Sequence, residues 1–362
     1  MTIASVEAAH YRIPLPVVLS DSTHGEIANF ELITARVRDG EGAEGVGYTY
    51  TVGAGGEAIA TLIARDLAPC LEGRNGAATE ILWHEMWWHL HYVGRGGIAA
   101  FAMAAVDVAL WDLKAKRAGQ PLWRLLGGSD PRVPAYAGGI DLQMPLEQLM
   151  QQTRDNLANG FRAIKMKVGR DLLAEDLARV AAMRELLGEG FPLMVDANMR
   201  WRVDEAVQAA RALQPFGLVW LEEPTIPDDI AGHARIAGEG GVPIATGENM
   251  HTIYEFQHMI AAGGVQFPEP DVSNCGGITP WLKIAHLAEA NNLPVTSHGV
   301  HDLHVHLLAA VPNSSYLEVH GFGLERFIEA PLALDGDGLA TAPDRPGHGV
   351  VFDWDGLKPL RV

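Results

Sequence analysis

Residues 192–224 read PLMVDANMRWRVDEAVQAARALQPFGLVWLEEP, and this stretch decides the fold. A short apolar run ends at Asp196, an Ala-rich segment with helical spacing follows, and a second apolar run ends at Glu222. This order predicts a strand, a helix and a second strand of one parallel sheet. Both runs end in a carboxylate, which a strand buried on both faces does not ordinarily carry. The stretch therefore predicts an α/β fold with acidic groups at the ends of its strands.

The same unit repeats along the rest of the chain. Ala-rich helical stretches such as EDLARVAAMRELL and PWLKIAHLAEA separate short apolar runs from about Gly127 onward. Eight runs are predicted to be strands, at residues 133–139, 163–169, 192–198, 218–224, 243–248, 265–271, 294–299 and 316–320. Eight strands that alternate with helices fit a closed α/β barrel, in which the carboxyl ends of all strands open onto one mouth.

The first third of the chain has a different rhythm. Residues 3–51 alternate between polar and apolar side chains, which predicts antiparallel strands, and residues 56–118 show helical spacing. No Ser- or Pro-rich linker separates this part from the barrel. We expect three segments: an α+β domain at 1–127, the barrel at 128–327, and a C-terminal segment at 328–362 that returns to the first domain.

Composition narrows the class of partner. A net charge of −18 over 362 residues argues against binding nucleic acid or an anionic membrane and favours a small-molecule substrate. Only two cysteines occur, Cys70 and Cys275, and we expect both to be buried apolar residues in a reducing, cytoplasmic setting. The N-terminus shows no secretory signal, and the Ala- and Gly-rich stretch 96–113 is predicted to be a packed core helix, not a membrane span.

Charged or polar residues end seven of the eight predicted strands, at intervals of 20 to 29 residues: Lys167, Asp196, Glu222, Glu248, Asp271, His298 and Glu318. Any one of them could be a solvated loop charge. Repetition at the period of the barrel predicts instead that they converge at its mouth, where active sites of this architecture lie. Asp196, Glu222 and Glu248 come from consecutive strands, and three crowded carboxylates resist ionisation unless a cation lies among them. An all-oxygen site of this kind favours Mg²⁺, with Mn²⁺ as a substitute.

Two further pairs indicate acid–base chemistry. Lys165 and Lys167 lie two residues apart on a strand and so point to one face, where their mutual repulsion is expected to lower the pKa of at least one. Asp271 and His298 end adjacent strands, so the carboxylate can orient the imidazole for general acid–base work. A zinc cluster of His301, His304 and His306 is the less favoured alternative, because the segment HDLHVHLLAAVP resembles the start of a helix in which these side chains cap or pack.

At these residues the chain resembles the mandelate racemase subgroup of the enolase superfamily, over almost its whole length. The matching motifs are Lys165-Met166-Lys167, Asp196-Ala197-Asn198, Glu222-Glu223-Pro224, Gly247-Glu248-Asn249, the Asp271 and His298 pair, and Glu318. The resemblance implies a (β/α)7β barrel with an α+β capping domain and one Mg²⁺ on Asp196, Glu222 and Glu248. It also implies that Lys167 and His298 are opposed acid–base groups, with Asp271 supporting His298.

The resemblance further implies that Lys165, Asn198 and a protonated Glu318 touch the substrate carboxylate or the enediolate formed after α-proton removal. We also expect His24 and Tyr50 to bind the substrate. The catalytic residues do not fix the fate of the enediolate. The polar loop VVLSDSTHGEI (17–27) suits hydroxyl groups better than a phenyl ring, and the segment NMHTIYEF (249–256) resembles that of galactarate and talarate dehydratases. We therefore favour dehydration of an aldonate or aldarate to a 2-keto-3-deoxy acid.

Three alternatives stay open. Reprotonation of the enediolate gives a racemase or epimerase, loss of a ring oxygen gives a sugar-acid cycloisomerase, and a barrel without chemistry would be a binding protein. A capping domain that faces neighbouring molecules makes a homo-oligomer the expected assembly.

Overall fold

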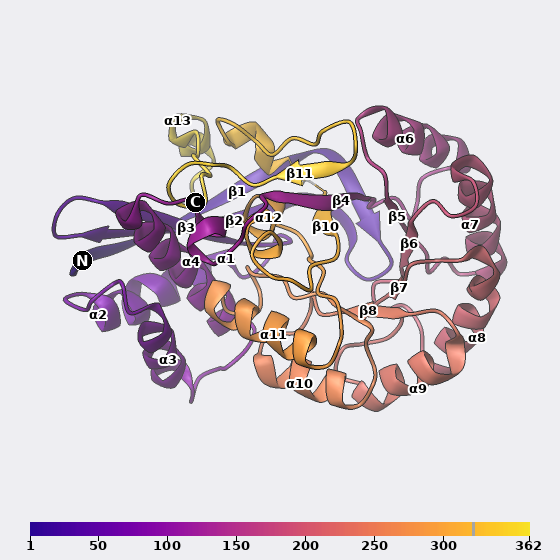
Figure 1. Ribbon diagram of the computed structural model, residues 1–362, viewed down its shortest axis with the longest axis horizontal. Coiled ribbons are helices and arrows are strands. Elements are labelled where there is room, and N and C mark those ends of the chain that lie inside the picture. The colour runs from indigo at the N-terminus through magenta and orange to yellow at the C-terminus, as the bar shows by residue number, and fades with distance from the viewer. Residues whose placement is uncertain (321–322) are drawn as a thin grey trace.

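The computed structural model describes residues 1–320 and 323–362 and has two parts, an N-terminal sheet with helices and a barrel (Figure 1). The N-terminal sheet is antiparallel, as predicted, and consists of β1 (Ile3–Asp21), β2 (Gly25–Asp39) and β3 (Glu44–Thr51) in that order. Its helices are α1 (Gly56–Leu62), α2 (Ala68–Leu71), α3 (Thr79–Leu90), α4 (Ile98–Ala118) and α5 (Leu122–Leu125), with a π-helical turn at Ile63–Leu67.

Helix α4 is the central helix of the N-terminal part, and two glycines of β3 explain how closely it packs. A Cβ on Gly45 or Gly47 would meet the α4 carbonyl oxygens of Ala109 or Ala105 at 2.1 Å. Glycine at both positions therefore lets the strand lie directly on the helix backbone. The Ala-rich stretch is a packed core helix, as predicted, and none of the described helices is both long enough and apolar enough to cross a membrane.

The second part is a curled parallel sheet ringed by helices (Figure 1). Its strands are β4 (Arg132–Gly138), β5 (Ile164–Lys167), β6 (Leu193–Asp196), β7 (Leu221–Glu222), β8 (Ile244–Thr246), β9 (Phe267–Pro268) and β10 (Leu317–Val319). Its helices are α6 (Leu146–Ala158), α7 (Leu173–Leu187), α8 (Val203–Leu213), α9 (Ile230–Gly240), α10 (Ile253–Ala261), α11 (Ile278–Ala290) and α12 (His301–Leu308). Strands follow chain order around the sheet, and β10 pairs with β4. The predicted α/β barrel fold is confirmed.

The prediction of a strand at 294–299 is wrong, because these residues do not form a regular strand. Only an isolated parallel bridge joins Val295 to Ser314, and the Thr296 amide donates to the Pro268 carbonyl at 3.0 Å. Pro294 has no amide proton to donate, and Ser297 uses its side-chain oxygen to accept from the Glu318 amide at 3.1 Å. The segment still lies between β9 and β10, so it completes the ring with irregular backbone.

The C-terminal segment contacts both parts. Strand β11 (Leu339–Thr341) pairs antiparallel with β4, and α13 (Trp354–Leu357) follows. The chain then ends beside β1, where the Val362 amide donates to the His10 carbonyl at 3.0 Å (Figure 1). We propose that the chain divides into domains as expected from the sequence, at 1–127, 128–327 and 328–362.

A buried carboxylate joins the N-terminal part to the barrel. Asp107, in the middle of α4, accepts hydrogen bonds from the Thr279 amide at 2.8 Å and the Thr279 hydroxyl at 2.7 Å, so it caps α11 from another domain. Burial raises the pKa of Asp107 to about 7, against the effect of those hydrogen bonds. A Cβ on Gly277 would meet the Asp107 carboxylate at 2.5 Å, so glycine leaves room for the cap.

We predict that Asp107→Ala lowers the stability of the folded protein by about 2 kcal/mol, because it leaves the buried Thr279 amide and hydroxyl without their acceptor. Thermal unfolding followed by circular dichroism measures the effect. Asp228→Ala, at an exposed Asp, is the control and should leave the midpoint unchanged. An unchanged midpoint in Asp107→Ala would show that the capping contact does not contribute to stability.

Candidate active site

The register of three adjacent strands brings the first charged residues together. Lys167 on β5 lies opposite Asp196 on β6, and Asp196 lies opposite Glu222 on β7. Because side chains in register on neighbouring parallel strands point the same way, all three enter the mouth of the barrel. Glu248 follows β8. The residue before it is Gly247, where a Cβ would meet the Glu269 backbone at 2.8 Å, so glycine lets the two segments lie close together.

The three predicted metal ligands form one cluster. One carboxylate oxygen from each of Asp196, Glu222 and Glu248 lies within 4.8 Å of the other two, and all three residues are buried. Each also accepts a hydrogen bond that orients it: Asp196 from the Asn198 amide at 2.8 Å, Glu222 from the Trp220 indole at 3.0 Å, and Glu248 from the Asn249 amide group at 3.3 Å. Oriented, all-oxygen ligands in a buried pocket fit a hard divalent cation such as Mg²⁺.

The two lysines lie among these carboxylates. Lys165 Nζ is 2.5 Å from a Glu222 oxygen and 2.7 Å from a Glu318 oxygen, and Lys167 Nζ donates to Asp196. The expectation of a lowered lysine pKa is wrong for this arrangement. Burial favours the neutral amines, but Glu222 and Glu318 raise the pKa of Lys165, and Asp196 raises the pKa of Lys167. The prediction considered the repulsion between the two lysines, but the attraction of the nearer carboxylates is stronger.

His298 and Asp271 form the predicted pair. His298 Nδ1 is 3.0 Å from an Asp271 oxygen, and His298 Nε2 is 3.1 Å from a Glu248 oxygen. Burial alone would lower the pKa of His298, but Glu248 and Asp271 raise it to about 10. The Asp271 carboxylate also accepts from the Ser273 amide and hydroxyl, both at 2.7 Å, and from the Tyr50 hydroxyl at 3.2 Å. Tyr50 thus links β3 of the N-terminal part to the Asp271–His298 pair.

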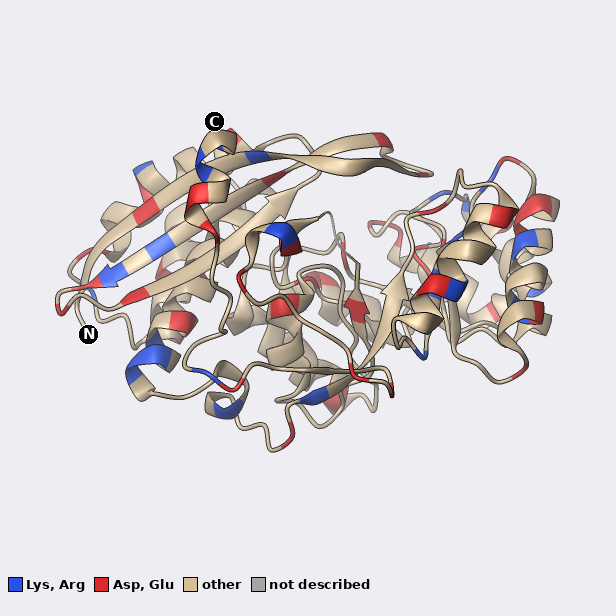
Figure 2. Ribbon diagram, turned by 90° about the horizontal axis from the view of Figure 1, so that it is seen from above, with Lys and Arg blue, Asp and Glu red and all other residues tan. Residues whose placement is uncertain are grey.

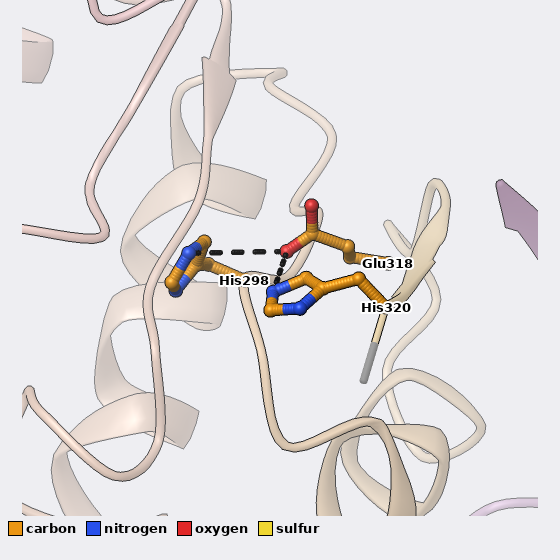
Figure 3. Close-up of side chains that lie close together, drawn as sticks. All are labelled: His298, Glu318 and His320. Atoms are coloured by element: carbon orange, nitrogen blue, oxygen red, sulfur yellow. Dashed lines mark ion pairs between the residues drawn. The ribbon is translucent and has the colours of Figure 1, made fainter. Parts of the chain in front are cut away.

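Glu318 lies between two imidazoles (Figure 3). Its Oε2 is 3.3 Å from His320 Nε2 and 3.9 Å from His298 Nε2. The expectation of a protonated Glu318 is wrong for this arrangement, because Lys165 and His320 overcome the effect of burial and hold its pKa well below the ordinary value. His320 was not among the residues predicted from the sequence. The signal for it was its position two residues after Glu318, just past the end of β10, because alternate residues of an extended backbone point the same way.

Backbone strain is concentrated at this mouth. Asn198, Glu223 and Val300 have φ values of 42°, 39° and 26°, and each follows a predicted site residue by one or two positions. Residues with side chains avoid this region, above all β-branched ones such as Val300. Such conformations persist only where the surrounding contacts impose them, and they cluster at functional sites.

A cavity of about 270 Å³ opens above these groups. Residues from both parts of the molecule line it: Asp21, His24, Ile27, Tyr50, Thr51, Val52, Ala54, Phe101, Gly139, Ile140, Lys167, Asn198, Glu248, Asn249, Asp271, Asn274, His298, Glu318 and His320. The long β1–β2 hairpin extends from the N-terminal part across the barrel (Figure 2). Its tip is attached by the Ser22 hydroxyl, which donates to the Ala197 carbonyl at 2.8 Å, so the hairpin covers the mouth.

Every predicted site residue is thus found at or beside this mouth, and their roles remain proposals. His24, Tyr50 and Asn198 line the cavity. His304 and His306 pack in α12, where His304 accepts from the Val272 amide at 3.0 Å and His306 accepts from the Trp123 amide at 3.3 Å. Cys275 is buried as expected, but Cys70 is only half-buried.

Comparison with known proteins places this geometry in a family. The model of the mandelate racemase / muconate lactonizing enzyme N-terminal domain matches residues 3–127, and the enolase C-terminal domain-like model matches residues 148–356. The 3,6-anhydro-alpha-L-galactonate cycloisomerase of Streptomyces coelicolor is 59% identical over 99% of both chains. The L-talarate/galactarate dehydratase of Salmonella typhimurium is 38% identical over 94% of this chain and 86% of its own.

Solved structures agree with this assignment. A racemase from Streptomyces coelicolor A3(2) with bound magnesium superposes with a TM-score of 0.97 at 58% identity, covering 99% of this chain and 100% of that one. L-Talarate dehydratase from Polaromonas sp. JS666, complexed with Mg and L-glucarate, superposes with a TM-score of 0.94 at 36% identity. The match covers 100% of this chain and 97% of that one. Magnesium in these relatives and an acidic triad here agree with the predicted Mg²⁺ cofactor.

We predict that Glu248→Gln weakens Mg²⁺ binding by more than about 100-fold, because loss of an outer-shell partner alone typically costs ten- to a hundredfold in metal affinity. Isothermal titration calorimetry with Mg²⁺, or electron paramagnetic resonance with Mn²⁺, measures it. Glu239→Gln, on the exposed end of α9, should bind as the unmodified protein does. Equal affinity in Glu248→Gln would remove Glu248 from the ligand set.

Proposed function

Because this chain belongs to the mandelate racemase and muconate lactonizing enzyme family of the enolase superfamily, we propose that it is a Mg²⁺-dependent sugar-acid cycloisomerase. The proposed substrate is an anhydro sugar acid with one carboxylate, and the proposed product is a 2-keto-3-deoxy acid. This replaces dehydration, favoured by the sequence, as the first candidate. The 59% identity to a cycloisomerase over the whole chain supports the change, together with the lining of the cavity.

The cavity lining is the observation that carries the choice of substrate. Among the lining residues that the structure describes, Lys167 is the only Lys or Arg, and it lies in the mouth beside Asp196. Apolar groups such as Ile27, Val52 and Phe101 also line the cavity. A second carboxylate, as in an aldarate, would be desolvated against these apolar groups without a cationic partner, which is costly. A compact, uncharged ring suits this lining better.

His24 does not change this conclusion. Its Nδ1 is 2.8 Å from an Asp21 oxygen, and that contact raises the pKa of His24. Burial opposes ionisation of Asp21, yet His24 lowers its pKa to about 2. The two residues thus form an ion pair with no net charge. The pair offers hydrogen bonds to hydroxyl groups and no unbalanced positive charge to a second carboxylate.

The chain's own residues then account for each proton. Lys167, at the end of β5, and His298, in the irregular segment 294–299, both line the cavity, and one of them takes the α-proton of the substrate. Asp196, Glu222 and Glu248 would hold the Mg²⁺, which would supply positive charge to offset the negative charge developing on the carboxylate. Lys165 lies on the same side and adds a fixed cationic donor. Asp271 keeps the Nδ1 of His298 hydrogen-bonded, so that Nε2 faces the mouth.

Ring opening follows from the position of the ether oxygen. In a 3,6-anhydro acid that oxygen is bonded to C3, which is β to the carboxylate. Collapse of the enediolate forms a C2–C3 double bond and breaks the C3–O bond, and the oxygen takes a proton and stays on C6 as a hydroxyl. The resulting enol gains a proton at C3 and loses one from its oxygen. No water leaves, so the product is an isomer of the substrate.

Dehydration of an aldonate is the second candidate. It shares the same first step, and the 38% identity to a talarate/galactarate dehydratase supports it. The two reactions differ in the leaving group, because a hydroxyl on C3 departs as water whereas a ring oxygen stays attached.

We predict that Lys167→Ala and His298→Asn each lower kcat by about 10²- to 10⁴-fold, because each removes one of the two acid–base groups. Folding and Mg²⁺ binding should persist in both variants. His301→Asn, which changes a histidine of α12, is the control. Full activity in either variant would rule out the scheme with two acid–base groups.

We expect an anhydro sugar acid, incubated with the protein and Mg²⁺, to give a 2-keto acid of unchanged mass, measured as the semicarbazone by mass spectrometry. Aldonates and aldarates are assayed alongside. A keto product lighter than its substrate by one water would establish dehydration instead. Exchange of the α-proton in heavy water without a keto product would indicate a racemase or epimerase, and no exchange with any acid would contradict the enediolate mechanism.

A further inference from the structure

A second group of candidate metal ligands lies beside the acidic triad (Figure 3). His298, Glu318 and His320 each offer one ligand atom, and these atoms lie within 4.8 Å of one another. The three side chains are largely buried, with exposed fractions of 18% for His298, 2% for Glu318 and 8% for His320. None of them belongs to the triad, so the group is separate from the proposed Mg²⁺ site.

The spacing of these ligand atoms fits a tetrahedral ion. Zinc lies about 2.0–2.2 Å from imidazole nitrogens and carboxylate oxygens, so two ligand atoms of a tetrahedral site lie about 3.3–3.6 Å apart. Glu318 Oε2 is 3.3 Å from His320 Nε2 and 3.9 Å from His298 Nε2. The first distance therefore matches a zinc site, and the second needs a movement of only a few tenths of an ångström.

The types of ligand select the metal. Two His and one Glu form a known zinc ligand set, in which a fourth position stays open to water or substrate. Mg²⁺ prefers ligands that are all oxygen, as in the acidic triad. His298, Glu318 and His320 all line the cavity of about 270 Å³, so the fourth position of an ion held by them would open into that cavity.

The groups behind the ligands support the same assignment. His298 Nδ1 is 3.0 Å from an Asp271 oxygen, which leaves Nε2 to face Glu318. A carboxylate that holds the other nitrogen of a ligand histidine is the usual arrangement around zinc. Glu318 Oε1 is 2.7 Å from Lys165 Nζ, so Lys165 holds one oxygen and leaves Oε2 to the imidazoles. Two of the three ligands are thus oriented by contacts outside the group.

We propose that His298, Glu318 and His320 form an inhibitory binding site for Zn²⁺. A zinc ion there replaces a proton at His298 Nε2, the atom that faces the mouth, and so prevents that nitrogen from exchanging protons with the substrate. Zinc binding depends only on these three side chains, whereas the inhibition rests on the proposed acid–base role of His298.

Isothermal titration calorimetry of Zn²⁺ into the Mg²⁺-saturated protein tests the site. We expect one zinc ion to bind per chain while Mg²⁺ stays bound. His320→Asn should weaken this binding by more than about 100-fold, because loss of an outer-shell partner alone typically costs ten- to a hundredfold in metal affinity. His286→Asn, at an exposed histidine of α11, is the matched control and should bind zinc as the unmodified protein does.

Cobalt reports the geometry of the site. Co²⁺ absorbs visible light strongly in a tetrahedral site and weakly in an octahedral one, so Co²⁺ added to the Mg²⁺-saturated protein should give the strong absorption. His320→Asn should lose it. Glu318→Gln, which keeps the shape of the side chain and removes its charge, should weaken it as well. Circular dichroism and retained Mg²⁺ binding show that each variant is folded.

Two results would overturn the inference. One is zinc that displaces Mg²⁺ and binds with equal affinity to His320→Asn, which would place zinc in the acidic triad. The other is full turnover with zinc bound beside Mg²⁺. Turnover is measured with whichever acid the protein converts, so a substrate other than an anhydro sugar acid would change the proposed function without changing this result.

Discussion

The mouth of the barrel buries an excess of negative charge, and the rest of the structure depends on how that charge is balanced. Asp196, Glu222, Glu248, Asp271 and Glu318 are all buried there, and Lys165, Lys167 and a protonated His298 offset only part of their charge. An uncompensated buried charge costs several kcal/mol. Burial and the charge of Asp196 accordingly raise the pKa of Glu222. A divalent cation bound by Asp196, Glu222 and Glu248 would balance this excess of negative charge. The charge of the site therefore favours the same ion as the proposed chemistry.

The fold holds these groups in place through contacts that have little freedom. Strand register aligns Lys167, Asp196 and Glu222, and the backbone beyond the strands bends through positive φ at Asn198 and Glu223. The N-terminal part contributes as well, because Tyr50 donates to Asp271. Asp107 caps α11, the helix that follows the Asp271 loop. Residues far from the substrate thus fix where the acid–base groups point.

Much of this was readable from the sequence, because barrel strands place one reactive residue per repeat. The positions of Asp196, Glu222 and Glu248 follow from that period alone. The pKa shifts of Lys165 and Glu318 do not follow from the period. They depend on the Lys165 ammonium group lying 2.5 Å from a Glu222 oxygen and 2.7 Å from a Glu318 oxygen, and strand spacing does not give such distances. Irregular backbone at 294–299 and the contact of His320 with Glu318 were missed for the same reason: both depend on hydrogen bonds between segments distant in sequence.

In the proposed function, the strand ends of the barrel and the residues of the N-terminal part have different tasks. The fate of the enediolate depends on the second group, which is why the residues at the strand ends do not determine it. Proton removal needs only the groups at the strand ends, which one barrel supplies. In the proposed reaction, what leaves afterwards depends on the part of the substrate that faces the Asp21–His24 pair and the apolar lining residues Ile27, Val52 and Phe101. Those residues come from the N-terminal part, whose loops can change without disturbing the barrel. We therefore propose that specificity resides in the segment that closes the mouth, because its neutral Asp21–His24 pair offers no unbalanced positive charge to a second carboxylate.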